Sequence, residues 1–194
     1  VEGLVADLLQ RGLAYEAQLV RIAALWRFAE LRERGRGADL LESVFADAWK
    51  LPESPQKKPS HRVLTRLVQL IPAFGMRERG LRLLHEVNEL TQQRSEAGVY
   101  FRNELLTSTA LAGSKLGDSR AAFELIQETA KLAISDFEKA SQSRRMGDQR
   151  WLLFETLDEC VNGTVDLGDP RRGLALVADV GETARGALAQ TREG

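Results

Sequence analysis

Two sets of charged side chains have the types and the spacing to do chemistry. Glu155, Asp158 and Glu159 stand three and four residues apart, which places carboxylates on one face of a helix, where a pair can act as general acid and general base. The same spacing is typical of a solvated helix face, so an enzyme remains an alternative. Between positions 57 and 82, Glu78 alone opposes seven basic residues: Lys57, Lys58, Arg62, Arg66, Arg77, Arg79 and Arg82. Such a basic strip can neutralise phosphates, which makes nucleic-acid binding another alternative.

The residue types that most catalytic and metal sites require are scarce. The chain has two histidines, His61 and His85, and one cysteine, Cys160. A catalytic zinc site commonly takes two or three imidazoles with a carboxylate, and a nucleophilic cysteine needs a nearby base. Cys160 lies in a run of apolar residues at helical spacing, so we expect a buried, inert thiol. We predict no metal site, no cofactor and no enzymatic activity.

Composition excludes several other classes. The 194 residues include 27 Lys and Arg against 28 Asp and Glu, with 43% hydrophobic residues, which rules out disorder, a fibre and a disulfide-stapled miniprotein. No overall charge excess drives bulk binding to nucleic acid or a membrane surface. A single cysteine permits no intramolecular disulfide, and no apolar stretch approaches a bilayer span, so we expect a cytoplasmic protein without membrane contact. The stretch 151–170 contains acidic residues but no Lys or Arg, so its charge is opposite in sign to that of the basic strip.

Apolar residues recur three and four residues apart along most of the chain, which predicts helices. Three of the five prolines fall within 51–59, which we expect to be an irregular connector. Asp118 and Asp169 each follow a glycine and are placed to cap helices, and Pro72 should end its helix early. We predict an all-α fold with helices at 3–11, 14–34, 38–50, 60–74, 77–95, 97–116, 119–141, 148–167 and 170–190.

A glycine pattern recurs between these helices. Gly35, Gly75, Gly117 and Gly168 each follow an apolar helix, and a small or apolar residue five positions later opens the next one. We expect each glycine to take the left-handed conformation that ends the first helix of a hairpin, and the later residue to let the second helix pack closely. This predicts hairpins at 14–50, 60–95, 97–141 and 148–190 in one helical-repeat domain spanning 1–194. Because Val1 already lies in helical sequence, we expect a piece of a longer protein.

The turns at Leu116-Gly117-Asp118 and Leu167-Gly168-Asp169, each with a small residue five positions after its glycine, resemble those of the tetratricopeptide family. The resemblance implies a right-handed α-solenoid of about four antiparallel hairpins. The glycine spacings of 40 to 51 residues are longer than that family's repeat, so a HEAT-like solenoid and a non-repetitive bundle remain alternatives. In the tetratricopeptide family the first helix of each hairpin lines a groove. The matched positions here are Arg62, Thr65, Arg66, Gln69, Glu104, Thr107, Ser108, Leu111, Glu155, Asp158 and Asn162.

These observations together predict a non-enzymatic scaffold that binds a polypeptide segment in a helical-repeat groove. Arg62 and Arg66 would attract an acidic segment. Flanking domains of the same polypeptide and other copies of the chain are further expected partners.

Overall fold

A computed structural model of the chain describes residues 1–51, 59–93, 99–142 and 146–190, and within these ranges every regular element is helical. The predicted all-α fold is thus confirmed. The predicted connector at 51–59 lies outside the described residues, except for its two ends. The helices are α1 (Glu2–Gln10), α2 (Ala14–Glu30), α3 (Arg34–Ala48), α4 (Pro59–Leu70), the 3-10 helix η1 (Ile71–Phe74), α5 (Arg77–Gln93), α6 (Val99–Lys115), α7 (Ser119–Gln142), α8 (Met146–Asp166) and α9 (Pro170–Gln190).

The helix ends follow from local chemistry. Asp118 accepts a hydrogen bond from the backbone N–H of Ala121 at 3.2 Å, and Asp169 accepts one from that of Arg172 at 3.1 Å, so both aspartates are N-caps as predicted. Pro72 lacks a backbone N–H, and α4 gives way at Leu70 to the 3-10 turn that contains it. This confirms the early end expected for that helix.

The turns inside the hairpins depend on one left-handed residue each. Gly75, Gly117 and Gly168 have φ values of +63°, +90° and +76°, as predicted. The prediction for the first hairpin was wrong, because Gly35 lies inside α3 and Arg32 takes the left-handed conformation instead, at φ +57°. We call Arg32, Gly75, Gly117 and Gly168 the turn residues.

The residue five positions after each turn residue is small and buried. In chain order these residues are Gly37, Gly80, Ala122 and Gly173. A Cβ atom at Gly37 would lie 2.7 Å from Cδ1 and 2.9 Å from Cζ of Phe74, and one at Gly173 would lie 3.3 Å from Cβ of Thr164. The close approach expected at the start of a second helix is therefore present at Gly37 and Gly173, and in the first hairpin it follows the turn at Arg32.

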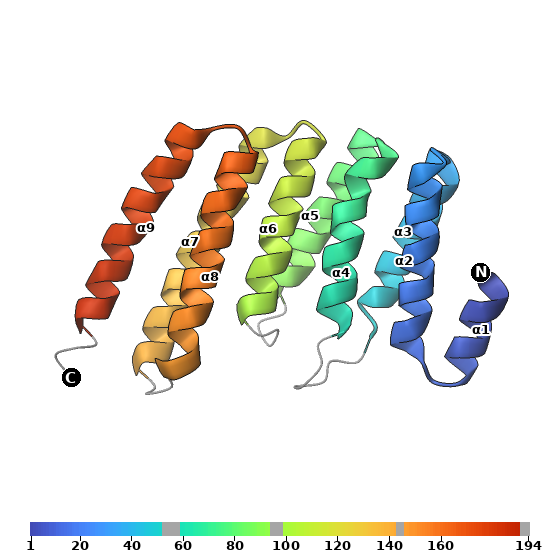
Figure 1. Ribbon diagram of the computed structural model, residues 1–194, viewed down its shortest axis with the longest axis horizontal. Helices are drawn as coiled ribbons and strands as arrows, with labels where there is room; N and C mark the ends of the chain where they lie inside the picture. Colours follow the sequence, from blue (N-terminus) through green and yellow to red (C-terminus); the bar gives the residue numbers. More distant parts are fainter. Residues whose placement is uncertain (52–58, 94–98, 143–145, 191–194) are drawn as a thin grey trace. The chain divides into compact units, whose positions relative to one another are not determined.

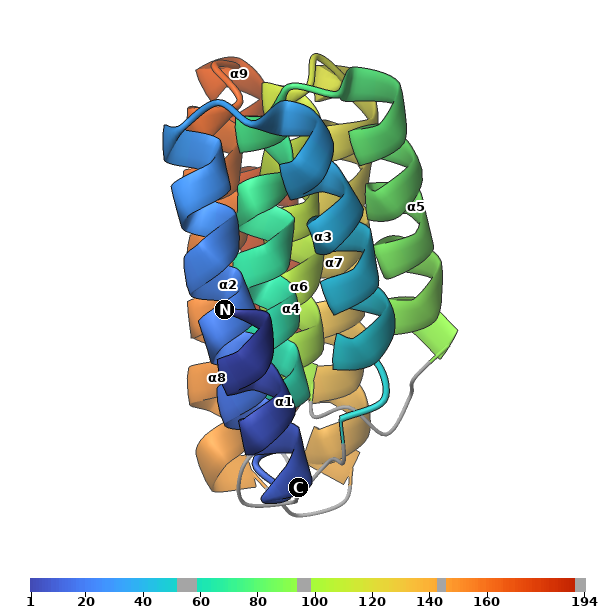
Figure 2. The ribbon, with the colours of Figure 1, turned by 90° about the vertical axis from the view of Figure 1, so that its right-hand side faces the viewer.

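The chain divides within α5 into two compact units, Val1–Glu89 and Leu90–Gly194. In the first unit, α2 contacts α1, α3 and α4, and α3 also contacts α4 and η1. Figure 2 shows α1, α2 and α3 nearest the viewer, with α1 against α2. Its core holds the fully buried side chains of Leu25, Leu41, Leu64, Leu67 and Phe74. The single domain predicted for 1–194 remains a prediction.

In the second unit, α6 contacts α7 and α8, α8 contacts α7 and α9, and α7 also contacts α9. The hairpin α8–α9 thus stacks on the hairpin α6–α7, first helix beside first helix and second beside second. Figure 1 shows α6 and α8 side by side with α7 behind α8. The core between these helices includes Ala110, Ile126, Phe137, Leu153 and Cys160.

Candidate functional site

Four predicted partner-binding residues lie on α4, and the structure separates them. Arg62, Arg66 and Gln69 are exposed, whereas Thr65 is only 6% exposed. The opposite side of α4 is buried through Val63 and Leu67 among others. Arg62 and Arg66 therefore stand one helical turn apart on an accessible face, and the Thr65 side chain belongs to the core.

The predicted residues of α6 also divide. Glu104, Ser108 and Leu111 are partly exposed, whereas Thr107 is 5% exposed. Thr107 is covered by α8, because a Cβ atom at Gly163 would lie 3.6 Å from Cγ2 of Thr107. The surface available to a partner on α6 therefore runs along Glu104, Ser108 and Leu111 and does not include Thr107.

On α8, the predicted residues remain accessible. Asp158 and Asn162 are exposed and Glu155 is partly exposed. The Asn162 Nδ2 atom donates a hydrogen bond to Oδ2 of Asp158 at 3.1 Å, which orients both side chains across one helical turn.

The acidic residues of α6 and α8 are close enough to act on one another. The pKa of Glu159 is raised to about 7, first because the side chain is partly buried and then because Glu104, Glu155 and Asp158 are like charges near it. We call Glu104, Ser108, Glu155, Glu159 and Asn162 the acidic face, with Asp158 at its edge. The predicted groove positions did not include Glu159, although its position four residues after Glu155 on the same helix was the available signal.

The cysteine beneath this face is buried, as predicted. Cys160 is 1% exposed, and burial raises the pKa of its thiol to about 12, although the nearby Thr107 side chain acts in the opposite direction. The thiol is therefore protonated near neutral pH, which disfavours a role as nucleophile.

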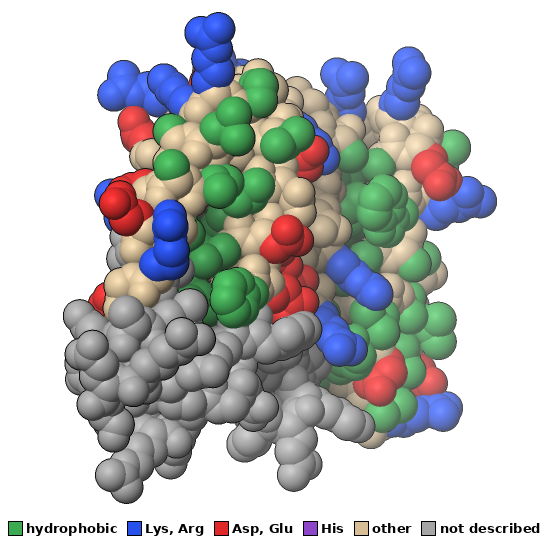
Figure 3. Space-filling view, turned by 60° about the vertical axis from the view of Figure 1, so that its left-hand side comes forward, with side chains coloured by type: hydrophobic (Ala, Val, Ile, Leu, Met, Phe, Trp, Pro, Cys, Tyr) green, Lys and Arg blue, Asp and Glu red, His purple; other side chains and the backbone are tan. Residues whose placement is uncertain are grey.

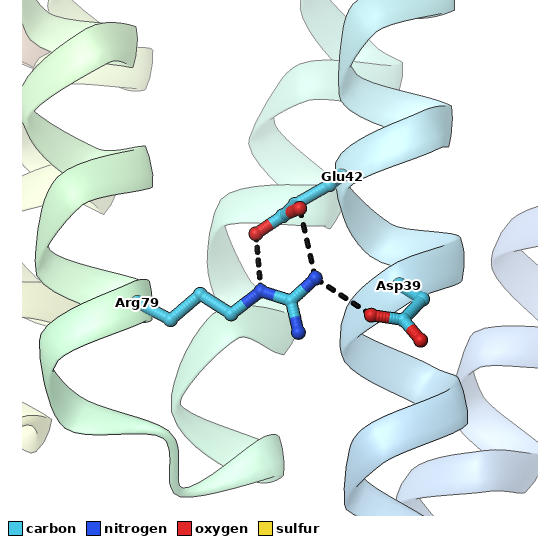
Figure 4. A network of polar contacts seen from close by, with 3 residues as sticks. All are labelled: Asp39, Glu42 and Arg79. Carbon is cyan, nitrogen blue, oxygen red and sulfur yellow. Dashed lines mark hydrogen bonds and ion pairs between the residues drawn. The ribbon is translucent and has the colours of Figure 1, made fainter.

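The basic strip predicted from the sequence is interrupted. Arg79 donates to both carboxylate oxygens of Glu42, one of them at 2.8 Å, and to Oδ1 of Asp39 at 2.7 Å (Figure 4). The Arg79 side chain is 23% exposed, and these two carboxylates of α3 hold the pKa of its guanidinium above the usual range. Arg77 and Arg82 are exposed on the same helix, and Lys57 and Lys58 lie outside the described residues.

No group of three or more metal-ligating side chains occurs within the part of the chain that the structure describes. His61 is buried at 3% exposure, and His85 lies 3.3 Å from Glu89 on an exposed part of α5. Among the described helices, none has a stretch long and apolar enough to cross a bilayer.

The second unit also has a cavity of about 710 Å³ between α7 and α9. The guanidinium of Arg172 stacks over the ring of Phe123 there, 5.0 Å from its centroid, and Leu176 forms part of the wall. The carboxylates of the acidic face do not line this cavity.

No protein-family model, no curated protein and no solved structure matches this chain.

Proposed function

We propose that the protein is a non-enzymatic scaffold of the α-solenoid type, tetratricopeptide-like or HEAT-like, that binds a basic polypeptide segment along its acidic face. The observation that carries the proposal is the stacking of α6 beside α8, which joins predicted partner-binding residues of two hairpins on one accessible surface. Side chains held on packed helices are ordered before binding, which limits the entropy lost when a partner docks.

Charge gives this surface its selectivity. Glu104 and Glu155 are like charges that disfavour the anionic form of Glu159, and a Lys or Arg side chain placed among them would relieve that repulsion. The apolar Leu111 side chain, partly exposed on α6, adds a contact for the segment's aliphatic groups. An extended basic segment is therefore the polypeptide that this surface favours.

The nucleic-acid alternative has less support. A phosphate backbone would be repelled by the acidic face, and Arg79 of the basic strip is engaged with Glu42 and Asp39. The enzymatic alternative would use the raised pKa of Glu159, but burial and like charges produce such shifts in purely structural clusters as well. We place the protein in the cytoplasm, in keeping with its single, buried cysteine.

Selection from a random peptide library against the purified chain tests the proposal. We expect the enriched peptides to be rich in Lys and Arg and to bind more weakly as salt concentration rises. The variant Glu155→Gln/Glu159→Gln, which keeps side-chain size, should weaken the best peptide by about tenfold. The control variant Glu124→Gln/Glu128→Gln removes two exposed carboxylates of α7 and should leave affinity unchanged.

Failure of the proposal would be plain in the same experiment. It is wrong if the library yields no binder, or if both double variants weaken the best peptide equally, since general charge would then explain binding. A second outcome would favour nucleic-acid binding by the basic strip. In that outcome nucleic acid co-purifies with the chain, and nuclease treatment releases both the nucleic acid and the proteins captured with it.

A further inference from the structure

Successive hairpins can be compared position by position from their turn residues. Three positions are compared: those fourteen and ten residues before the turn residue, and the one nine residues after it. In the hairpins α2–α3 and α6–α7 the side chains at all three positions are buried. These are Gln18, Ile22 and Leu41 in the first and Asn103, Thr107 and Ile126 in the second, all between 0% and 5% exposed. The same three positions of the hairpin α8–α9 are Phe154, Asp158 and Val177, and all three are exposed.

The burial in α6–α7 has a direct cause, which is the next hairpin. The Nδ2 atom of Asn103 lies 3.4 Å from Oγ1 of Thr156 in α8. A Cβ atom at Gly163 of α8 would lie 3.0 Å from Cδ1 of Ile126 and 3.6 Å from Cγ2 of Thr107. The equivalent face of α8–α9 is therefore the kind of surface that this fold covers with helices.

That face is apolar where it is exposed. Phe154 is 55% exposed, Val177 41%, and two further large side chains join them, Val165 at 58% and Leu174 at 71%. Figure 3 shows hydrophobic side chains gathered on this side of the molecule. We call Phe154, Asp158, Val165, Leu174 and Val177 the end face. Exposed apolar groups of this size usually mark an interaction surface.

The end face has a negative charge on α8 and positive charges beside it on α9, so the end faces of two copies can be complementary in charge. Asp158 shares a face of α8 with Phe154 and Val165, because the three are separated by four and seven residues. On α9, the exposed Arg171 and Arg185 lie on the same side as Leu174. A two-fold axis that sets α8 of one copy against α9 of another therefore brings a carboxylate near an arginine twice, once on each side of the axis.

We propose that the end face is the interface of a two-fold symmetric dimer, in which α8 of each copy packs against α9 of the other. Phe154 and Leu174 supply its apolar centre, and Asp158 pairs with an arginine of the second copy. A second copy satisfies both the apolar and the charged parts of the surface. The end face and the acidic face meet at Asp158, which is bonded to Asn162 of the acidic face, whereas Glu104, Glu155 and Glu159 lie outside the end face.

Sedimentation velocity of the purified full chain, over about 1 to 100 µM, tests the dimer. We expect a species of twice 21.6 kDa at the upper concentrations. Phe154→Glu/Leu174→Glu should give a monomer across the range, with an unchanged helical circular dichroism spectrum, because both side chains are already exposed. The matched control Trp26→Glu/Leu31→Glu changes two exposed apolar side chains of the first unit and should remain dimeric.

A charge exchange keeps the test independent of these apolar substitutions. Asp158→Arg and Arg185→Asp should each raise the dissociation constant several-fold, and the double variant should recover most of the loss. A wild-type chain that stays monomeric at 100 µM, or forms species larger than a dimer, overturns the proposal. So does a dimer that survives Phe154→Glu/Leu174→Glu, or one that the Trp26→Glu/Leu31→Glu control also dissociates.

Discussion

Gly37 lies directly against the ring of Phe74, so that a Cβ atom at position 37 would sit 2.9 Å from Cζ and 2.7 Å from Cδ1 of that ring. The contact joins the second helix of the first hairpin to the 3-10 turn that follows α4. Phe74 is 1% exposed, so its ring has little room to move away.

Gly37→Ala should therefore destabilise the first unit, although alanine is the better helix former. We expect a loss of about 1–3 kcal/mol in the free energy of unfolding, measured by urea denaturation, because a methyl group would overpack the core. Gly35→Ala is the matched control. A Cβ atom at position 35 has nothing within 4 Å, so that variant should be neutral or more stable. Equal stability of the two variants would contradict the close packing of Gly37.

The same contact shows what the sequence could and could not reveal. Glycine and aspartate side by side marked the turns at Gly117 and Gly168, because glycine tolerates a positive φ and aspartate caps the next helix. In the first hairpin a glycine was present at position 35, but the turn came at Arg32. An arginine can take the left-handed conformation when the surrounding structure fixes the backbone there, and local preference does not record that constraint.

The partner-binding surface could be predicted only in part, for a related reason. Helical periodicity placed Thr107 and Glu104 near each other on α6, three residues apart. It could not say which of them the next hairpin would cover, because that depends on contacts with Gly163 more than fifty residues later. Pairing between residues far apart in the sequence also determines which arginines of the basic strip are available, because Asp39 and Glu42 of α3 bind Arg79.

The Arg79 network should contribute measurably to stability. Arg79→Ala leaves Asp39 and Glu42 as neighbouring like charges, and we expect a loss of about 1 kcal/mol in the free energy of unfolding. Arg120→Ala is the control, since the pair Arg120–Glu124 is 89% and 61% exposed and should contribute less than about 0.5 kcal/mol.

Acid should weaken the Arg79 network in a predictable direction. Hydrogen bonds from Arg79 hold the pKa of Glu42 below its ordinary value of 4.5. The stabilisation is therefore present above pH 4.5 and is lost as the pH falls through the lowered pKa. The difference between the wild type and Arg79→Ala should shrink correspondingly in urea titrations at low pH, and a constant difference would contradict this account.

Glu159 should show the opposite dependence on pH. Its pKa in the folded chain is about 7 against an ordinary value of 4.5, so the folded state binds more protons than the unfolded state between these values. Its contribution is most favourable below pH 4.5 and is lost as the pH rises through 7. Allowing for partial exposure, we expect Glu159→Gln to gain about 1–2 kcal/mol on the wild type between pH 5 and pH 8.

Urea unfolding at the two pH values measures this gain, with Glu86→Gln as a control for an exposed carboxylate. The gain should be absent in the control. If Glu159→Gln shows no gain either, the acidic residues of α6 and α8 do not repel one another as strongly as their placement indicates. Peptide binding at the acidic face should then also be insensitive to Glu155→Gln/Glu159→Gln.

Arg62 and Arg66 carry the remaining prediction, which concerns a partner of opposite charge. They stand exposed one turn apart on α4, and such a pair favours an acidic segment. Arg62→Glu/Arg66→Glu should weaken binding of an acidic peptide by about tenfold in fluorescence anisotropy at low salt, and raising the salt should remove the difference. Arg27→Glu/Arg36→Glu, which reverses two exposed arginines of α2 and α3, is the control and should bind like the wild type. Unchanged affinity in Arg62→Glu/Arg66→Glu would show that α4 does not recognise acidic segments, and basic segments at the acidic face would remain the favoured partner.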